Sequence, residues 1–236
     1  QMCIRDSYNT CAVKGPTEDK MINLLRSVPD GKRLIVAGCL PLINPERLSR
    51  EVRFDGLLGP AAGQEVVEAV KAVVEGYRFF KVKVDFKPEA GAPFKLLNPV
   101  RRIIPVAYGC LGACSFCCVR FARGRLRSYS IGEIVEQVER AVREGVKEVW
   151  LTGQDLSCYG LDIGLSLPEL LEAVVRVEGD FKVRVGMMNP SYLLPIAEEV
   201  AKILRHPKIF KFIHIPVQSG DDKVLKLMNR LSLIHI

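Results

Sequence analysis

Three cysteines near the middle of the chain have the spacing of metal ligands. Cys110, Cys114 and Cys117 form a C-x3-C-x2-C group on an expected loop. Soft thiolate ligands favour zinc or an iron–sulfur cluster. Three thiolates bind three irons of a four-iron cluster, which leaves the fourth iron open to a substrate or cofactor. Cys118 is expected to be a small packing residue, because adjacent side chains rarely converge on one tetrahedral metal.

The elements that must position these cysteines alternate between strands and helices. Strands are predicted at 102–107, 147–152, 181–186 and 210–215, with helices near 131–144, 167–177 and 193–204. Strand–helix repetition of this kind builds a parallel sheet, either open or curled into part of a barrel. Chemistry in such sheets lies beyond the carboxyl ends of the strands.

Four loops of unusual composition follow these predicted strands. They contain Cys110, Gln154, Asn189 and Gln218. A single polar turn needs no ligand, but four at one sheet edge, together with three cysteines, predict a site. Three further residues are expected to take no part in it: Cys158, which is expected to be buried, His206 and His235.

A smaller α/β layer is predicted before residue 77. Its strands are expected at 34–37 and 56–58, and its helices from Pro16, at 45–52 and at 64–74. The last helix is expected to turn its valines inward: Val66, Val67, Val70, Val73 and Val74. Residues 77–101 have no helical period, and they are expected to form a linker with a ribbon at 79–86.

Composition excludes a disordered chain. Of 236 residues, 48% are hydrophobic and 26% charged, and 34 Lys and Arg against 27 Asp and Glu give a net charge of +7. The longest charge-free stretch, 103–119, is interrupted by Pro105 and two glycines, so no transmembrane helix is expected. The N-terminus lacks a signal-peptide pattern, which favours the cytoplasm, where thiols stay reduced.

The cysteine triplet, with Phe116 before its last member, resembles the signature of the radical S-adenosylmethionine (radical SAM) superfamily. Other motifs are similar to its methylthiotransferases: 123–128, 150–155, 159–160, 184–190 and 214–219. The resemblance implies a 4Fe-4S cluster bound by Cys110, Cys114 and Cys117, whose free iron chelates S-adenosylmethionine. Electron transfer then cleaves the sulfonium to a radical. The residues implied to hold the cofactor are Phe116, Gly153, Gln154, Arg184 and Gln218.

Two N-terminal motifs also resemble the methylthiotransferases. These are 9–19 and 37–41, which contain Cys11 and Cys39. The family resemblance implies that both cysteines bind a second, auxiliary 4Fe-4S cluster that carries the sulfur to be inserted. A further cysteine ligand of the family lies upstream of this chain's first residue. Cys11 and Cys39 are therefore expected to approach each other at the carboxyl edge of the first sheet and to face the cysteine loop.

The resemblance implies a domain layout. A truncated, flavodoxin-like parallel-sheet domain (8–76) and the linker (77–101) precede an incomplete radical SAM (β/α) partial barrel (102–230). Residues 1–7 and 231–236 match nothing in the family and are expected to be foreign sequence. The resemblance implies that this sequence does not include the last barrel strands and a small C-terminal RNA-binding β-domain of the family.

The amino-acid sequences of the motifs are most similar to those of the archaeal and eukaryotic branch of the family. That branch inserts a methylthio group at C2 of N6-threonylcarbamoyladenosine, next to the tRNA anticodon. The implied partners are a tRNA and an electron donor such as a flavodoxin or ferredoxin, and the chain is expected to be a monomer. Alternative substrates are isopentenyladenosine in tRNA or an aspartate of a ribosomal protein.

A zinc-stabilised nucleic-acid-binding module is the alternative from another class. In that interpretation, a group of arginines contacts the phosphates of the nucleic acid: Arg120, Arg123, Arg125 and Arg127. The basic composition fits both classes. Colour separates them, because zinc sites are colourless and iron–sulfur clusters are brown.

Overall fold

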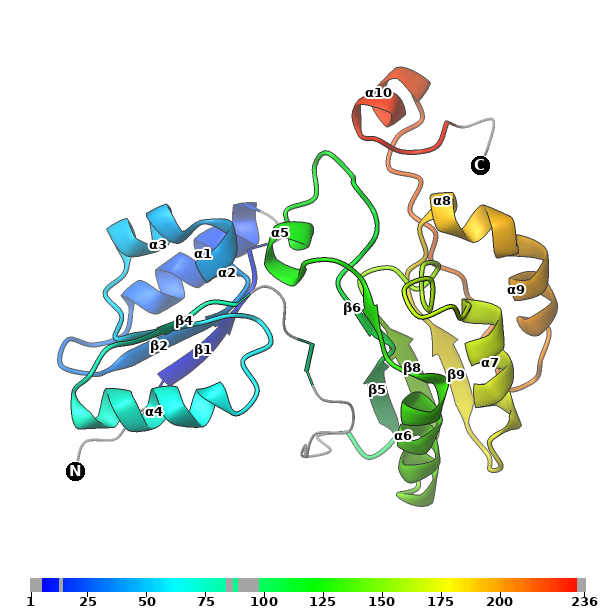
Figure 1. Ribbon diagram of the computed structural model, residues 1–236, viewed down its shortest axis with the longest axis horizontal. Helices are drawn as coiled ribbons and strands as arrows, with labels where there is room; N and C mark the ends of the chain where they lie inside the picture. The colour runs from blue at the N-terminus through cyan, green and yellow to red at the C-terminus, as the bar shows by residue number, and fades with distance from the viewer. Residues whose placement is uncertain (1–5, 13–14, 84–86, 89–97, 233–236) are drawn as a thin grey trace. The chain divides into compact units, whose positions relative to one another are not determined.

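The chain divides into two units in a computed structural model that describes residues 6–12, 15–83, 87–88 and 98–232 (Figure 1). The first unit contains the described residues up to Pro88 together with Cys117–Gly124, and the second contains the others. Most of the expected foreign sequence, at 1–5 and 233–236, lies outside the described residues.

The first unit is a parallel sheet with helices on both faces (Figure 1). Its strands, in spatial order, are β1 (Asp6–Thr10), β2 (Leu34–Gly38), β3 (Gly56–Leu58) and β4 (Phe79–Lys81). Its first four helices are α1 (Gly15–Arg26), α2 (Leu40–Ile43), α3 (Pro45–Glu51) and α4 (Glu65–Glu75). Side chains alternate along β2, so Leu34 and Val36 pack with α1 and α3 while Ile35 packs with α4.

Two details of this unit differ from the sequence expectation. Residues 79–81, assigned to the linker, form the edge strand β4, which pairs in parallel with β3. In α4, the buried residues are Ala69 and Val73, whereas three of the valines expected to point inward, Val66, Val67 and Val74, are exposed. Ala69 and Val73 lie four positions apart and pack in one cluster with Ile35 and Leu58 of the sheet, so the face that carries Val67 and Val74 is turned toward solvent.

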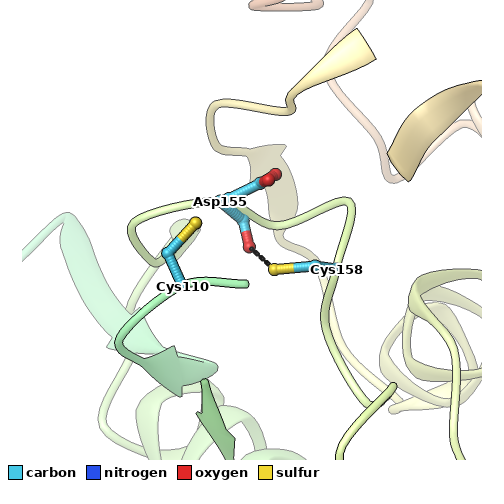
Figure 2. A group of neighbouring side chains, drawn as sticks. All are labelled: Cys110, Asp155 and Cys158. Atoms are coloured by element: carbon cyan, nitrogen blue, oxygen red, sulfur yellow. Dashed lines mark hydrogen bonds between the residues drawn. The ribbon is translucent and has the colours of Figure 1, made fainter. Parts of the chain in front are cut away.

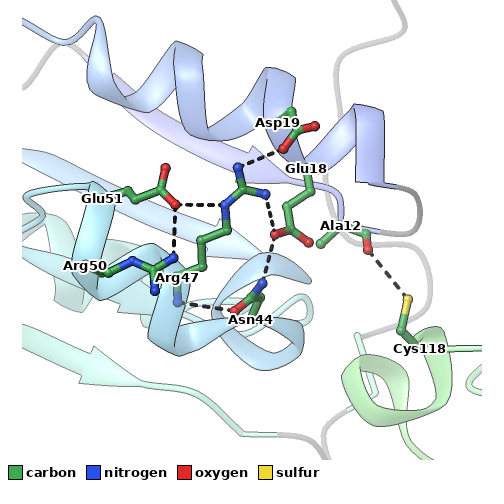
Figure 3. Close-up of polar contacts among 8 residues, drawn as sticks. All are labelled: Ala12, Glu18, Asp19, Asn44, Arg47, Arg50, Glu51 and Cys118. Carbon is green, nitrogen blue, oxygen red and sulfur yellow. Dashed lines mark hydrogen bonds and ion pairs between the residues drawn. The ribbon is translucent and has the colours of Figure 1, made fainter.

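Helices α1 and α3 are joined by an ion-pair network (Figure 3). Arg47 pairs with Asp19 at 2.7 Å, Glu18 at 2.9 Å and Glu51 at 3.0 Å. Hydrogen bonds to these three carboxylates raise the pKa of Arg47 above its ordinary value. Asn44 caps α3 by accepting a hydrogen bond from the Arg47 backbone N–H, and its amide donates to Glu18.

The second unit is built on a parallel sheet covered by helices. Its strands, in spatial order, are β5 (Arg101–Pro105), β8 (Glu148–Thr152) and β9 (Lys182–Val185), and β6 (Ala107–Tyr108) pairs antiparallel with β7 (Arg127–Ser128). The helices are α6 (Ile131–Arg143), α7 (Leu167–Arg176), α8 (Pro190–Leu193), α9 (Ala197–Ile203), α10 (Asp222–Leu227) and the short 3-10 turn η1 (Leu194–Ile196). Helix α5 (Val119–Arg123) belongs to the first unit.

One sheet face of this unit forms its core. Alternate residues of the strands, such as Ile104, Val149 and Val183, are fully buried in one cluster with the apolar side of α6 and α7. Helix α6 begins at a capping box in which Ser130 and Glu133 satisfy each other's backbone N–H groups. The architecture confirms the α/β class. Across the described residues, no helix has both the length and the apolar character that a membrane crossing requires.

The expected fourth strand, 210–215, is not formed. Among the described residues, the strand pairing of this region is limited to two isolated bridges, Val183 with Ile209 and Met187 with His214. Between them, the Phe212 N–H donates to the Phe210 carbonyl at 2.8 Å. This local bond bends the backbone away from β9, so the ladder is interrupted.

Candidate metal and cofactor site

The cysteine loop, defined as residues 109–116, follows β6 in the second unit. It starts at Gly109, whose φ of +81° suits a residue without a side chain. The Gly109 N–H donates to Oε1 of Gln154 at 2.8 Å. Gln154 lies just beyond the end of β8. The sequence predicted it only as a cofactor-binding residue, but its side chain also binds the backbone at the start of the loop.

Two of the predicted metal ligands lie on either side of Gly112. The Gly112 N–H donates to Cys110 Sγ at 3.1 Å. A Cβ added to Gly112 would lie 3.2 Å from Cys110 Sγ and 3.8 Å from Cys114 Sγ. Cys114 Sγ also accepts a hydrogen bond from Nη1 of Arg230 at 3.5 Å. Hydrogen bonds to sulfur stabilise thiolate ligands, so the donor set and its surroundings fit an iron–sulfur cluster.

Cys117 belongs by its contacts to the first unit, together with α5. The convergence of Cys110, Cys114 and Cys117 on one cluster therefore stays a prediction. Phe116, just before it, is 51% exposed, so its ring is open to solvent for half of its surface.

Cys158 lies close to the first cysteine of the loop (Figure 2). The Sγ atoms of Cys110 and Cys158 and a carboxylate oxygen of Asp155 all lie within 4.8 Å of one another. The Cys158 thiol donates to the Asp155 carbonyl at 3.2 Å. A hydrogen bond with Cys110 and burial raise the pKa of Cys158. Cys158 is buried as expected, but it contacts the predicted site instead of lying apart from it.

Asp155 joins two of the loops that follow strands. Its Oδ1 accepts from the Ser157 N–H at 3.0 Å, from the Ser157 hydroxyl at 2.5 Å and from the Asn189 N–H at 3.0 Å. Asp155 and Asn189 are both buried, and Oδ2 of Asp155 has no hydrogen-bond partner among the described residues. Sequence reasoning missed this connection, although both residues follow predicted strands.

The other residues expected to bind the cofactor, Gly153, Arg184 and Gln218, each have different neighbours in the structure. Gly153 has only ordinary contacts around its absent side chain, the nearest being 3.4 Å from Leu156. The Arg184 guanidinium lies 4.3 Å from the ring centroid of Trp150 and 5.0 Å from that of Phe212. Gln218 is exposed and has a φ of +83°. Their contacts with a cofactor stay predictions.

Cys11 and Cys39 are placed by the register of the first sheet. Thr10 on β1 pairs with Gly38 on β2, so each cysteine directly follows a paired residue at the carboxyl edge. The Cys39 N–H donates to the Thr10 carbonyl at 3.0 Å. Cys39 is buried and Cys11 is exposed. The two cysteines therefore lie at neighbouring strand ends of one sheet edge, whereas their joint binding of a cluster and their facing of the cysteine loop stay predictions.

Cys118 lies near these two cysteines in the first unit. Its thiol donates to the Ala12 carbonyl at 3.5 Å (Figure 3). Burial raises the pKa of Cys118, and the neighbouring Cys117, Cys39 and Cys11 add to the effect. A protonated thiol bonded to a carbonyl suits the packing role that the sequence indicated.

Comparisons with known proteins agree on one superfamily. Residues 104–233 match the protein-family model described as "Radical SAM superfamily". The chain is 43% identical over 226 residues to a probable threonylcarbamoyladenosine tRNA methylthiotransferase of Pyrococcus abyssi, covering 94% of this chain and 53% of the relative. The human threonylcarbamoyladenosine tRNA methylthiotransferase is 41% identical, at 94% and 40% coverage. The chain thus spans about half the length of the curated relatives it matches.

A solved structure shares the fold. The radical S-adenosylmethionine methyltransferase TsrM from Kitasatospora setae, with cobalamin and a 4Fe-4S cluster bound, aligns with a TM-score of 0.62 at 17% identity. The alignment covers 98% of this chain and 52% of that one.

Proposed function

The chain belongs to the radical SAM superfamily, and from this premise we propose that it is part of a threonylcarbamoyladenosine tRNA methylthiotransferase. Relatives with that name from an archaeon and from humans are 43% and 41% identical over nearly the whole chain. The proposed reaction inserts a methylthio group at C2 of N6-threonylcarbamoyladenosine next to the anticodon.

The observation that carries the proposal is the arrangement of sulfur atoms in the cysteine loop. Gly112 separates Cys110 and Cys114, and each sulfur accepts a hydrogen bond, from the Gly112 N–H and from Arg230. These donors stabilise negative sulfur and orient it, which is the role of the residues around a metal site. Cys117 supplies the third thiolate. When bound, the cluster supplies the electron that cleaves S-adenosylmethionine.

The residues around the loop hold and orient the cofactor in this proposal. Gln154 fixes the start of the loop through Gly109, and Gly153 leaves room for close approach. Phe116 offers exposed surface within the cysteine loop, and Gln218 offers exposed surface in the segment 214–219. Arg184 is a candidate partner for a carboxylate.

Cys11 and Cys39 are the proposed ligands of an auxiliary 4Fe-4S cluster. Their positions directly after the paired residues Thr10 and Gly38, at one edge of the sheet, support this assignment. Sulfur transfer to the substrate requires the reacting groups to be held close together. Further parts of the proposal are a tRNA substrate, a flavodoxin or ferredoxin as electron donor, a monomeric enzyme and a cytoplasmic location.

Substitution of neighbouring cysteines tests the radical cluster. After anaerobic reconstitution with iron and sulfide, Cys117→Ser should lose most of the visible absorption and iron, because one of three thiolate anchors is removed. Cys118→Ser is the matched control and should keep both. Full iron content in Cys117→Ser, or a colourless wild-type chain that binds zinc instead, would reject the cluster assignment.

The substrate is tested in cells. Mass spectrometry of tRNA nucleosides should detect the 2-methylthio derivative of N6-threonylcarbamoyladenosine with the complete gene and only the unmodified nucleoside without it. A methylthio group found instead on isopentenyladenosine would assign the other tRNA substrate.

A further inference from the structure

The end of α10 has a backbone geometry that fixes the direction of the chain after the helix. The Arg230 N–H donates to the Leu225 carbonyl at 2.9 Å and the Asn229 N–H to the Lys226 carbonyl at 3.1 Å. Asn229 has a φ of +54°. This is the Schellman pattern, which ends a helix through one left-handed residue, often Gly and sometimes Asn. Leu225 is fully buried, which fixes the helix itself.

This helix end is bonded to two residues of the cysteine loop, Ala113 and Ser115. Ser115 donates from its N–H to the Met228 carbonyl at 3.2 Å and from its hydroxyl to the Leu227 carbonyl at 2.7 Å. The Asn229 amide donates to the Ala113 carbonyl at 3.0 Å. The last carbonyls of a helix have no partner within it, so the loop serves as the cap that they require. Residues 227–230 are called the clasp below.

Arg230 extends the clasp to the predicted ligand between these loop residues. Its Nη1 donates to Cys114 Sγ at 3.5 Å, and its Nη2 donates to the Pro216 carbonyl at 2.8 Å. Two nitrogens of one planar guanidinium therefore hold the loop and the 214–219 segment at a fixed separation. A lysine has a point charge on a flexible stem, and it lacks this fork.

We propose that the clasp sets the cysteine loop for cluster binding and that Arg230 is its positioning residue. The inference rests on the proposed function for the identity of the metal group, but the clasp itself is a property of the chain. Arg230 places a positive charge beside a thiolate, which stabilises negative sulfur. Hydrogen bonds to the sulfurs are among the factors that set the reduction potential of an iron–sulfur cluster. Loss of this donor is expected to make the potential more negative.

The cluster-free chain tests the clasp without any metal. Hydrogen exchange followed by mass spectrometry should show protection of the Ser115 amide in the wild type, and several-fold faster exchange in Arg230→Gln. Arg143→Gln is the control, because this exposed arginine of α6 pairs only with Glu139 among the described residues. Unchanged exchange at 113–116 in Arg230→Gln would overturn the clasp, whatever the cluster result.

The reconstituted chain tests the role of Arg230 toward the cluster. Arg230→Gln should release iron to a chelator several-fold faster than wild type and have a more negative midpoint potential. Arg230→Lys should restore part of the potential, because charge is kept, but not the slow iron release, because the fork is lost. Wild-type potential and release rate in Arg230→Gln would reject the positioning role. A wild-type chain that binds no iron–sulfur cluster on reconstitution but shows normal Ser115 protection would reject the iron–sulfur proposal and keep the clasp.

Discussion

The two units position their cysteines in different ways. In the first unit, Cys11 and Cys39 take their places from the register between β1 and β2, so backbone pairing alone places them at neighbouring strand ends. In the second unit, Cys110 and Cys114 lie on a loop held by side chains from later in the sequence, Gln154 and Arg230 among them. Damage to the first arrangement should therefore unfold the unit, whereas damage to the second can alter the site and leave the fold intact.

The largest effect is expected from Gly38→Ala in the first unit. Gly38 has a φ of +99°, and an added Cβ would lie 2.4 Å from the Thr10 carbonyl oxygen. Because backbone must move, the free energy of unfolding of this unit should fall by about 3 kcal/mol or more. Urea unfolding followed by far-UV circular dichroism measures it. Gly31→Ala is the control: its φ is +86° but no atom lies within 4 Å, so about 1 kcal/mol is expected.

Asp155→Ala should have the next largest effect, in the second unit. It removes three hydrogen bonds and leaves the buried N–H groups of Ser157 and Asn189 without this acceptor. The expected loss in unfolding free energy is about 2–3 kcal/mol. Fluorescence of Trp150, the single tryptophan, follows this unit during urea unfolding. Ser157→Ala removes only the hydroxyl bonds and should cost about 1 kcal/mol; an equal loss in both variants would contradict the role of the carboxylate.

Alkaline pH should destabilise the second unit through two buried tyrosines. Burial raises the pKa of Tyr129 from its ordinary 10 to about 12, and burial also raises the pKa of Tyr159. Below pH 10 both tyrosines keep their hydroxyl protons in the folded and in the unfolded state, so stability is not reduced. Between pH 10 and about 12 only the unfolded state loses them, so stability falls by up to about 1.4 kcal/mol per pH unit for each group. Tyr129→Phe should have a shallower decline, and an identical slope would refute this origin.

Gly112→Ala should have the smallest effect on stability. It distinguishes damage to the metal site from damage to the fold. The added Cβ meets the end of the Cys110 side chain at 3.2 Å, which can rotate away. Unfolding free energy should change by less than about 1 kcal/mol, whereas reconstituted iron content should fall clearly below wild type. A loss of stability as large as that of Gly38→Ala would contradict the difference between the two units.

Sequence patterns predicted the elements better than their faces and contacts. Strands such as β8 and β9 and helix α6 were predicted because their apolar periods are strong. The burial of Ala69 in α4 was not predictable, because it depends on how closely the helix approaches the sheet. The interrupted strand after residue 209 was likewise set by a local bond that competes with the ladder.

The sequence predicted only those parts of the candidate site that residue spacing and strand ends indicate. C-x3-C-x2-C identified the loop, and the strand ends identified the edge on which it lies. The contacts of Cys158 with Cys110, and of Arg230 with Cys114, join residues far apart in sequence. No local period or spacing records such contacts, because they arise only when the chain has folded.

The first unit is discontinuous in the chain, since Cys117–Gly124 packs with it although the intervening residues belong to the second. Helix α5 lies against α2, and Ala122 is fully buried. A ribosome synthesises residues in order, so the nascent first unit lacks this helix until Gly124 has been translated, well after Pro88. Its α2 surface stays uncovered during that interval and is open to chaperones. For the same reason, a protein truncated at Pro88 is not the whole of this folding unit.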